Sequence, residues 1–184
     1  MSEALFEVAT EPSPVEAPKA KWTERMMLDL LRDRHTVNAG NGPRYVFAEH
    51  VRNYCGFAGY RTTTPLRTID ALAVDLWPSS GHLIHGFEVK VSRSDWLTEL
   101  KDPDKAEAFR PYVDHWWLVV SDPAIVRDDL PDGWGLMCVI GAGSHGGPSL
   151  RVRKRAPRIE RQPMPLEMTA AWLRATAKTA GRTA

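Results

Sequence analysis

The fold is decided by residues 67–96, which read RTIDALAVDLWPSSGHLIHGFEVKVSRSDW. Apolar residues recur with a period of two over residues 69–77 and again over residues 83–91, as expected for β-strands. The PSSG turn between the two runs predicts that they pair as a hairpin. Ser92 can then cap a helix that runs to about Lys101. This stretch predicts a strand, a turn, a strand and a helix.

Three further elements are expected on the N-terminal side of the hairpin. A helix is predicted from Trp22 to about Arg34, with Thr23 as its cap, because apolar residues recur there at helical spacing. The same reasoning predicts a second helix over residues 45–54, which carries Glu49. Three threonines before a proline indicate a short strand over residues 59–64.

On the C-terminal side, a buried strand is expected first and further elements follow it. The expected elements are a helix or turn over 104–112, a continuous apolar strand over 115–120, strands over 135–140 and 150–154, and an amphipathic helix over 165–178. The order of helices and strands predicts an α/β or α+β domain with a central mixed sheet flanked by helices.

Length and composition place the chain among ordinary globular proteins. With 184 residues, 43% hydrophobic and 26% charged, it can build one core, and a fully disordered chain is excluded. No apolar run is long enough to span a bilayer, and the acidic start does not read as a signal peptide, so we expect a cytoplasmic protein without membrane contact. The expected organisation is a flexible leader over 1–20, a domain over 21–157 and a basic tail over 158–184.

The formal net charge of +1 hides a partition along the chain. Residues 150–184 hold nine basic and two acidic groups, whereas residues 22–149 hold 13 basic and 17 acidic groups. A basic tail beside a mildly acidic domain could bind a polyanion, because each neutralised phosphate releases counterions. A tail that is simply solvated explains the same charges equally well.

Two carboxylates and a lysine interrupt the apolar pattern of the hairpin. Asp70 begins an otherwise apolar row, and Glu88 and Lys90 are two residues apart, so they share one side of the sheet. The hairpin can bring the three together, and a hard divalent ion would neutralise the two carboxylates. The alternative is a solvated ion pair of Glu88 and Lys90, with Asp70 at a strand end.

In these residues the chain resembles the PD-(D/E)xK nuclease superfamily, with Ile69-Asp70 followed by Glu88-Val89-Lys90 and with isoleucine where the signature has proline. A narrower resemblance, over about residues 45–140, is to MmcB-type DNA-repair proteins and related phage and actinobacterial proteins. The segments that carry it are Arg67 to Leu72, Gly86 to Trp96, Tyr112 to Trp117 and Trp134 to Leu136.

The resemblance implies a restriction-endonuclease-like αβββαβ core and metal-dependent hydrolysis of phosphodiester bonds in DNA. It implies that Asp70, Glu88 and the carbonyl of Val89 hold Mg²⁺ or Mn²⁺, with Glu49 as the acidic residue of the first core helix. Lys90 would then position the attacking water. A domain of the same fold that binds DNA without cleaving it is the main alternative, and a structural domain with neither property is another.

Basic and hydroxyl residues around these positions are candidates for contact with the DNA backbone. They are Arg67, Ser92, Arg93, Lys101 and Lys105. The competing interpretation is local: Ser92 acts only as a helix cap, and the basic side chains pair with acidic residues on the helix surface. Cleavage of both strands would need a homodimer or two successive visits.

Overall fold

The structure, a computed structural model, describes residues 21–39, 42–55, 65–141 and 146–182. Its centre is a six-stranded sheet in the order β3-β4-β5-β6-β7-β8, beside a small two-stranded ribbon of β1 and β2. The strands are β1 (Asn38–Ala39), β2 (Gly42–Pro43), β3 (Tyr45–Arg52), β4 (Thr68–Asp75), β5 (Ile84–Lys90), β6 (His115–Val120), β7 (Gly135–Ile140) and β8 (Ser149–Lys154). The helices are α1 (Glu24–His35), α2 (Arg93–Glu99), α3 (Pro103–Glu107) and α4 (Leu166–Ala180).

The sheet is mixed, as expected. Strands β3, β4 and β5 pair antiparallel, β5, β6 and β7 pair parallel, and β8 returns antiparallel to β7. The predicted hairpin is confirmed by the β4–β5 pairing, in which Ala71 lies opposite Phe87 and Val74 lies opposite Ile84. The parallel step from β5 to β6 requires a crossover, and α2 and α3 supply it.

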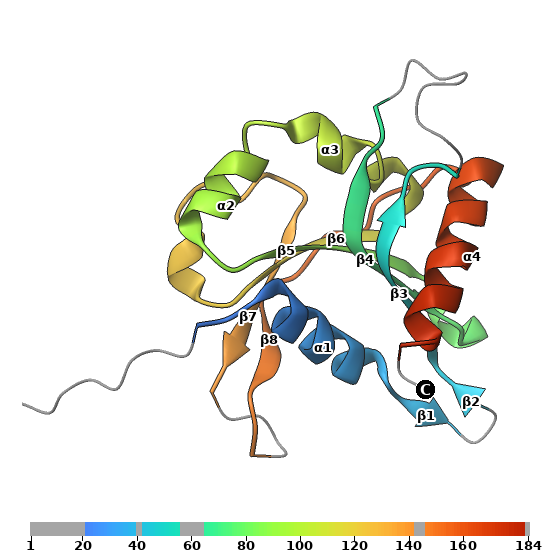
Figure 1. Ribbon diagram of the computed structural model, residues 1–184, viewed down its shortest axis with the longest axis horizontal. Helices are drawn as coiled ribbons and strands as arrows, with labels where there is room; N and C mark the ends of the chain where they lie inside the picture. Colours follow the sequence, from blue (N-terminus) through green and yellow to red (C-terminus); the bar gives the residue numbers. More distant parts are fainter. Residues whose placement is uncertain (1–20, 40–41, 56–64, 142–145, 183–184) are drawn as a thin grey trace, which may run out of the picture.

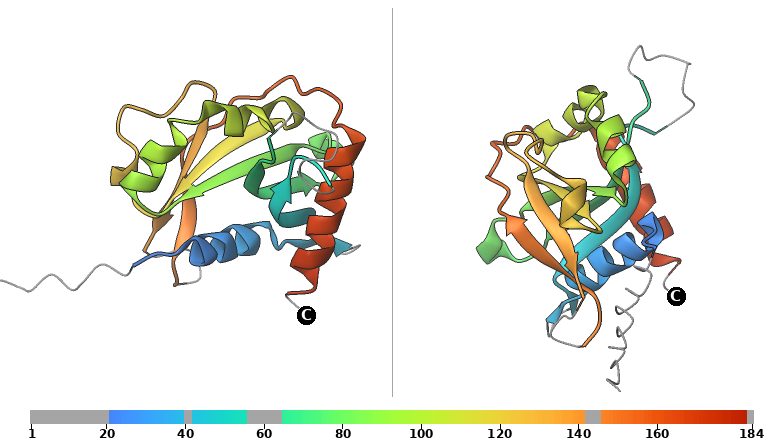
Figure 2. Two further views of the ribbon diagram at one scale, coloured as in Figure 1. Left: turned by 45° about the horizontal axis from the view of Figure 1, so that its top comes forward. Right: turned by 90° about the vertical axis from the view of Figure 1, so that its left-hand side faces the viewer.

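Helices cover both faces of the sheet (Figures 1 and 2). Helix α1 packs on one face, where Met27, Leu28 and Leu31 join Phe87 and other side chains in one buried cluster. Helices α2 and α3 cover the other face, and α4 stands beside β3 at the sheet edge. The second cluster, on this other face, contains buried tryptophans of α2 and β6 and buried residues of α4, which are Trp96, Trp116, Met168 and Ala175.

One prediction about the chain before the hairpin is wrong. Residues 45–52 form strand β3, not a helix, and Glu49 therefore lies on a strand. Neighbouring side chains of β3 are buried on opposite faces, with Phe47 against the α1 cluster and Ala48 in the cluster that α4 joins, so the strand lacks the alternation of apolar and polar residues that identifies a half-exposed strand. The β-branched and aromatic residues in this segment are typical of a strand.

The expected αβββαβ order is nevertheless present, with different members. Helix α1 is the first element and β3, β4 and β5 are the three strands, followed by α2 with α3 and then β6. The short strand expected over 59–64 lies outside the described residues.

The remaining elements agree with expectation. Thr23 caps α1 by accepting a hydrogen bond from the backbone N–H of Met26, and Ser92 caps α2 in the same way through Asp95. The helix expected in the basic tail is α4, which buries Met168, Ala171, Ala175 and Thr179. Among the described residues, no helix is long and apolar enough to cross a membrane.

Candidate functional site

The candidate site begins where β4 and β5 separate. The β4–β5 ladder extends to the pair Ala71–Phe87, and beyond it the Asp70 carboxylate occupies the space between the strands. Asp70 Oδ2 accepts the backbone N–H of Val89 at 2.7 Å. In a strand the N–H and C=O of one residue leave on the same edge, so the Val89 carbonyl also leaves β5 on the β4 side. The next carbonyl, that of Lys90, accepts a hydrogen bond from Ser121 on the β6 side at 3.4 Å.

Glu88 and Lys90 lie together on the other face of β5, as the spacing predicts, but they are not solvated. Glu88 is 1% exposed and Lys90 is 9% exposed. The Lys90 ammonium lies 2.5 Å from Glu88 Oε1 and 3.0 Å from Glu99 Oε2 of α2. Lys105 also contacts Glu88 and lies 2.9 Å from Glu99 Oε2. Two carboxylates and two ammonium groups thus form a buried cluster beneath the point where the strands separate.

Burial and neighbouring charge act in opposite directions within this cluster. Burial, followed by the negative charge of Asp70, raises the pKa of Glu88. Burial alone would lower the pKa of Lys90, but the charges of Glu88, Asp70 and Glu99 outweigh it and raise that pKa. Lys90 therefore remains a cation, held in place by two carboxylates.

A cleft opens above this cluster, with a volume of about 460 Å³. Asp70, Val89 and Lys90 line it together with Glu24, from the first turn of α1, and Glu99. One oxygen of Glu99, Oε1, is buried without a hydrogen-bond partner among the described residues. The cleft therefore combines acidic groups with a held cation, which suits a cationic ligand that itself carries water or an anion.

Three side chains at the cleft could share one metal ion. Ligand atoms of Glu24, His50 and Asp70 lie within 4.8 Å of one another, about twice a typical metal–oxygen distance of roughly 2.1–2.5 Å. They come from α1, β3 and β4, so the sheet and α1 together assemble the group. Glu88 is not part of this group, because its carboxylate is turned into the buried cluster.

His50 has an unusual backbone conformation for a strand residue. Its φ is 51°, in the left-handed region, and the β3–β4 ladder skips the position between the pairs Glu49–Ala71 and Val51–Ile69. A non-glycine residue with positive φ is uncommon, and such strained positions cluster at functional sites. The interruption falls beside Asp70 of the neighbouring strand.

Glu49 does not join the metal-ligand group, contrary to the expectation from the resemblance. Its side chain is fully buried and accepts hydrogen bonds from three guanidinium groups: Arg25 at 2.6 and 2.7 Å, Arg32, and Arg182 of the C-terminal segment at 3.2 Å. Although burial opposes it, the bonds from Arg25 and Arg32 lower the pKa of Glu49 to about 2. Its oxygens are occupied, and Glu24 is the acidic residue that the first helix contributes to the cleft.

Most of the residues expected to contact DNA have partners within the protein. Arg67 pairs with Asp102, and Arg93 pairs with Asp129 at 2.5 Å. Ser92 caps α2 and Lys105 belongs to the buried cluster, whereas Lys101 is exposed. The local interpretation thus describes Ser92, and Arg67 and Arg93 pair internally, Arg93 with a partner outside its own helix.

Three residues at the cleft were not expected from the sequence: Glu24, His50 and Glu99. Only Glu99 had a usable signal, because it lies three residues after Trp96 on the buried side of α2, where a carboxylate is unusual. Glu24 reads as an ordinary acidic residue in a first turn.

Comparison with known proteins adds no function. No family model matches the chain, and no curated protein matches it. A solved structure, "SPO1766 protein of unknown function from Silicibacter pomeroyi", aligns over 91% of this chain and 89% of its own, with 17% sequence identity and a TM-score of 0.49. Function therefore has to be argued from the site.

Proposed function

We propose that this protein is a metal-dependent DNA nuclease whose site is the cleft where β4 and β5 separate. The observation that carries the proposal is the combination at this point of the Asp70 carboxylate, the Val89 backbone and the buried Lys90 ammonium. Phosphodiester hydrolysis needs an activated water and positive charge beside the scissile phosphate. A held lysine next to a cation site can provide for both.

The residues present fit a divalent ion. Glu24, His50 and Asp70 would hold it, with the Val89 carbonyl on the same strand edge, and these donors suit Mn²⁺ and also Mg²⁺. When bound, the ion would lower the pKa of a water and stabilise charge on the phosphate. Lys90 would orient the attacking water, because its ammonium is fixed by Glu88 and Glu99. Glu88 acts here by positioning Lys90.

The geometry of Glu88 also supports a second candidate, a DNA-binding protein of this fold that does not cleave. The resemblance assigns Glu88 to the metal, but in this arrangement its Oε1 accepts from Lys90 and Lys105. A cation would then have one carboxylate fewer than the resemblance implies. DNA binding without cleavage under any metal condition would favour this candidate.

Metal removal tests the proposal directly. Wild-type protein is incubated with duplex, single-stranded and branched DNA in Mn²⁺, in Mg²⁺ and in EDTA. We expect cleavage with either ion, none in EDTA, and recovery when excess Mn²⁺ is added. Mn²⁺ should bind more tightly than Mg²⁺, because an imidazole nitrogen is a poorer ligand for the harder ion. Cleavage that persists in EDTA, or its absence with both ions while Mn²⁺ binds, would contradict the proposal.

His50 provides a test of the ligand group that does not depend on activity. His50→Gly should lower Mn²⁺ affinity at least about tenfold, since even loss of a residue that only supports a ligand typically costs that much. It should be no less stable than wild type and more stable than His50→Ala, because glycine adopts positive φ without steric cost. Calorimetric Mn²⁺ titration and urea denaturation in EDTA measure the two effects. Unchanged Mn²⁺ affinity would remove His50 from the ligand group.

A further inference from the structure

A second cavity, of about 280 Å³, lies between α4 and the ends of β3 and β4. Its polar lining is mostly cationic, from the end of β3 and from α4 and the residues just after it. These cations are Arg52, Arg174, Lys178 and Arg182. We call this cavity the α4 groove.

The cations of α4 are arranged in a row. Arg174, Lys178 and Arg182 are four residues apart, so they project from one side of the helix and its C-terminal continuation, about 6 Å apart along the axis. Arg52, Arg174 and Lys178 are exposed and have no hydrogen bond or ion pair with any described residue. Three cations of the groove are therefore available to an outside ligand.

The one acidic residue among the described residues that line the groove does not cancel this charge. It is Glu49, whose single negative charge is shared by Arg25, Arg32 and Arg182. Arg182 remains 53% exposed while it contacts Glu49. The buried carboxylate thus anchors the guanidinium groups and leaves the groove with excess positive charge.

The groove also adjoins the candidate metal site. His50 lines the groove, and its imidazole belongs to the group with Glu24 and Asp70. A ligand that lies along α4 would therefore reach the cleft where β4 and β5 separate. The row of α4 cations covers about 12 Å, which is longer than a single phosphate and corresponds to roughly three or four phosphates along one DNA strand.

We propose that the α4 groove binds the phosphate backbone of DNA and directs a strand toward Asp70. The proposal rests on the proposed function for the identity of the ligand. It also accounts for the excess basic charge at the C-terminal end of the chain: part of it forms a fixed binding surface.

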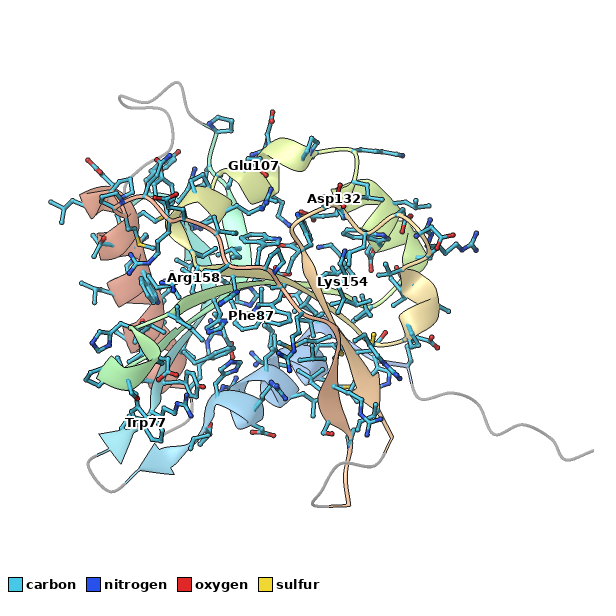
Figure 3. The ribbon with its side chains drawn as sticks, turned by 180° about the vertical axis from the view of Figure 1, so that it is seen from behind. Trp77, Phe87, Glu107, Asp132, Lys154 and Arg158 are labelled. Carbon is cyan, nitrogen blue, oxygen red and sulfur yellow. The ribbon has the colours of Figure 1, made fainter. Side chains whose placement is uncertain are left out.

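Matched charge removals test the groove. The groove variant is Arg174→Ala with Lys178→Ala, and the control is Arg151→Ala with Lys154→Ala on β8, at the opposite edge of the sheet. Figure 3 shows Lys154 on β8, away from α4. Both variants lose one arginine and one lysine from exposed positions, so they change the net charge equally. Circular dichroism of both confirms that the fold is retained.

Binding to labelled single-stranded and duplex DNA is measured in EDTA by fluorescence anisotropy over a range of salt concentrations. The groove variant should lose about 0.7 to 0.9 of the log–log salt slope per contact, and so bind roughly 25-fold to 60-fold more weakly at about 0.1 M salt. The control should bind within about threefold of wild type. Equal losses in both variants, or no binding by wild type, would overturn the groove.

Cleavage by the same proteins in Mn²⁺ separates this proposal from the proposed function. Groove-dependent binding by a wild type that never cleaves would leave the groove in place and overturn the nuclease. Cleavage by wild type with unchanged kcat/KM in the groove variant would overturn the groove and retain the nuclease.

Discussion

Asp70→Asn is expected to reduce metal-dependent DNA cleavage by at least about 10³-fold, equivalent to about 4 kcal/mol of transition-state stabilisation. Asparagine keeps an oxygen that can accept the Val89 N–H, so the junction of β4 and β5 is retained. It removes the negative charge that binds the ion. Single-turnover cleavage in Mn²⁺, with Mn²⁺ affinity measured in parallel, checks the prediction.

The matched control is Asp132→Asn, which removes the same charge from an exposed loop residue outside the cleft (Figure 3). It should cleave at the wild-type rate. Cleavage by Asp70→Asn within tenfold of wild type would exclude Asp70 from the reaction. Lys90→Ala is a less informative variant, because it leaves Glu88 and Glu99 buried with one ammonium group fewer, which destabilises the fold as well as the site.

Glu49→Ala is expected to lower the free energy of unfolding by about 3–5 kcal/mol, the usual cost of breaking a buried ion pair by removing one partner. The guanidinium groups of Arg25, Arg32 and Arg182 would then lie together without their shared anion. Urea denaturation measures the change. The control is Glu107→Ala, an exposed glutamate paired with Arg110 on the same helix surface, which should cost less than about 1 kcal/mol.

The contribution of Glu49 should also depend on pH. Its pKa falls from 4.5 in the unfolded chain to about 2 in the folded protein, so the folded state favours the ionised form. The stabilisation is therefore fully present above about pH 4.5 and is lost as pH falls toward 2. The difference in unfolding free energy between wild type and Glu49→Gln should shrink over this range. A difference that stays constant from pH 6 to pH 3 would contradict the role of Glu49 as an anchor for the arginines.

The hairpin and its helix could be predicted from the sequence because their signals are local. The two-residue period over 69–77 and 83–91, the PSSG turn and the cap at Ser92 each depend on residues within a few positions of one another. The same is true of Thr23 and the first helix. The side of the sheet shared by Glu88 and Lys90 also followed from strand geometry alone.

The strand character of residues 45–52 depends on packing that no local pattern records. Strand β3 is covered by α1 on one face and by α4 on the other, and α4 lies more than a hundred residues later in the chain. With both faces buried, the apolar residues no longer alternate with polar ones. Their spacing is then compatible with a helix as well as a strand.

By itself, the sequence determined the hairpin, the mixed α/β class and the pairing of Glu88 with Lys90, because each depends on backbone geometry over a few residues. The tertiary structure alone decided that Glu24 and His50 meet Asp70, and that Glu49 binds three arginines instead of a metal. These contacts join residues up to 133 positions apart. Charges at such separations meet only when helices and strands pack against one another, and this packing also places the α4 cations beside the candidate site.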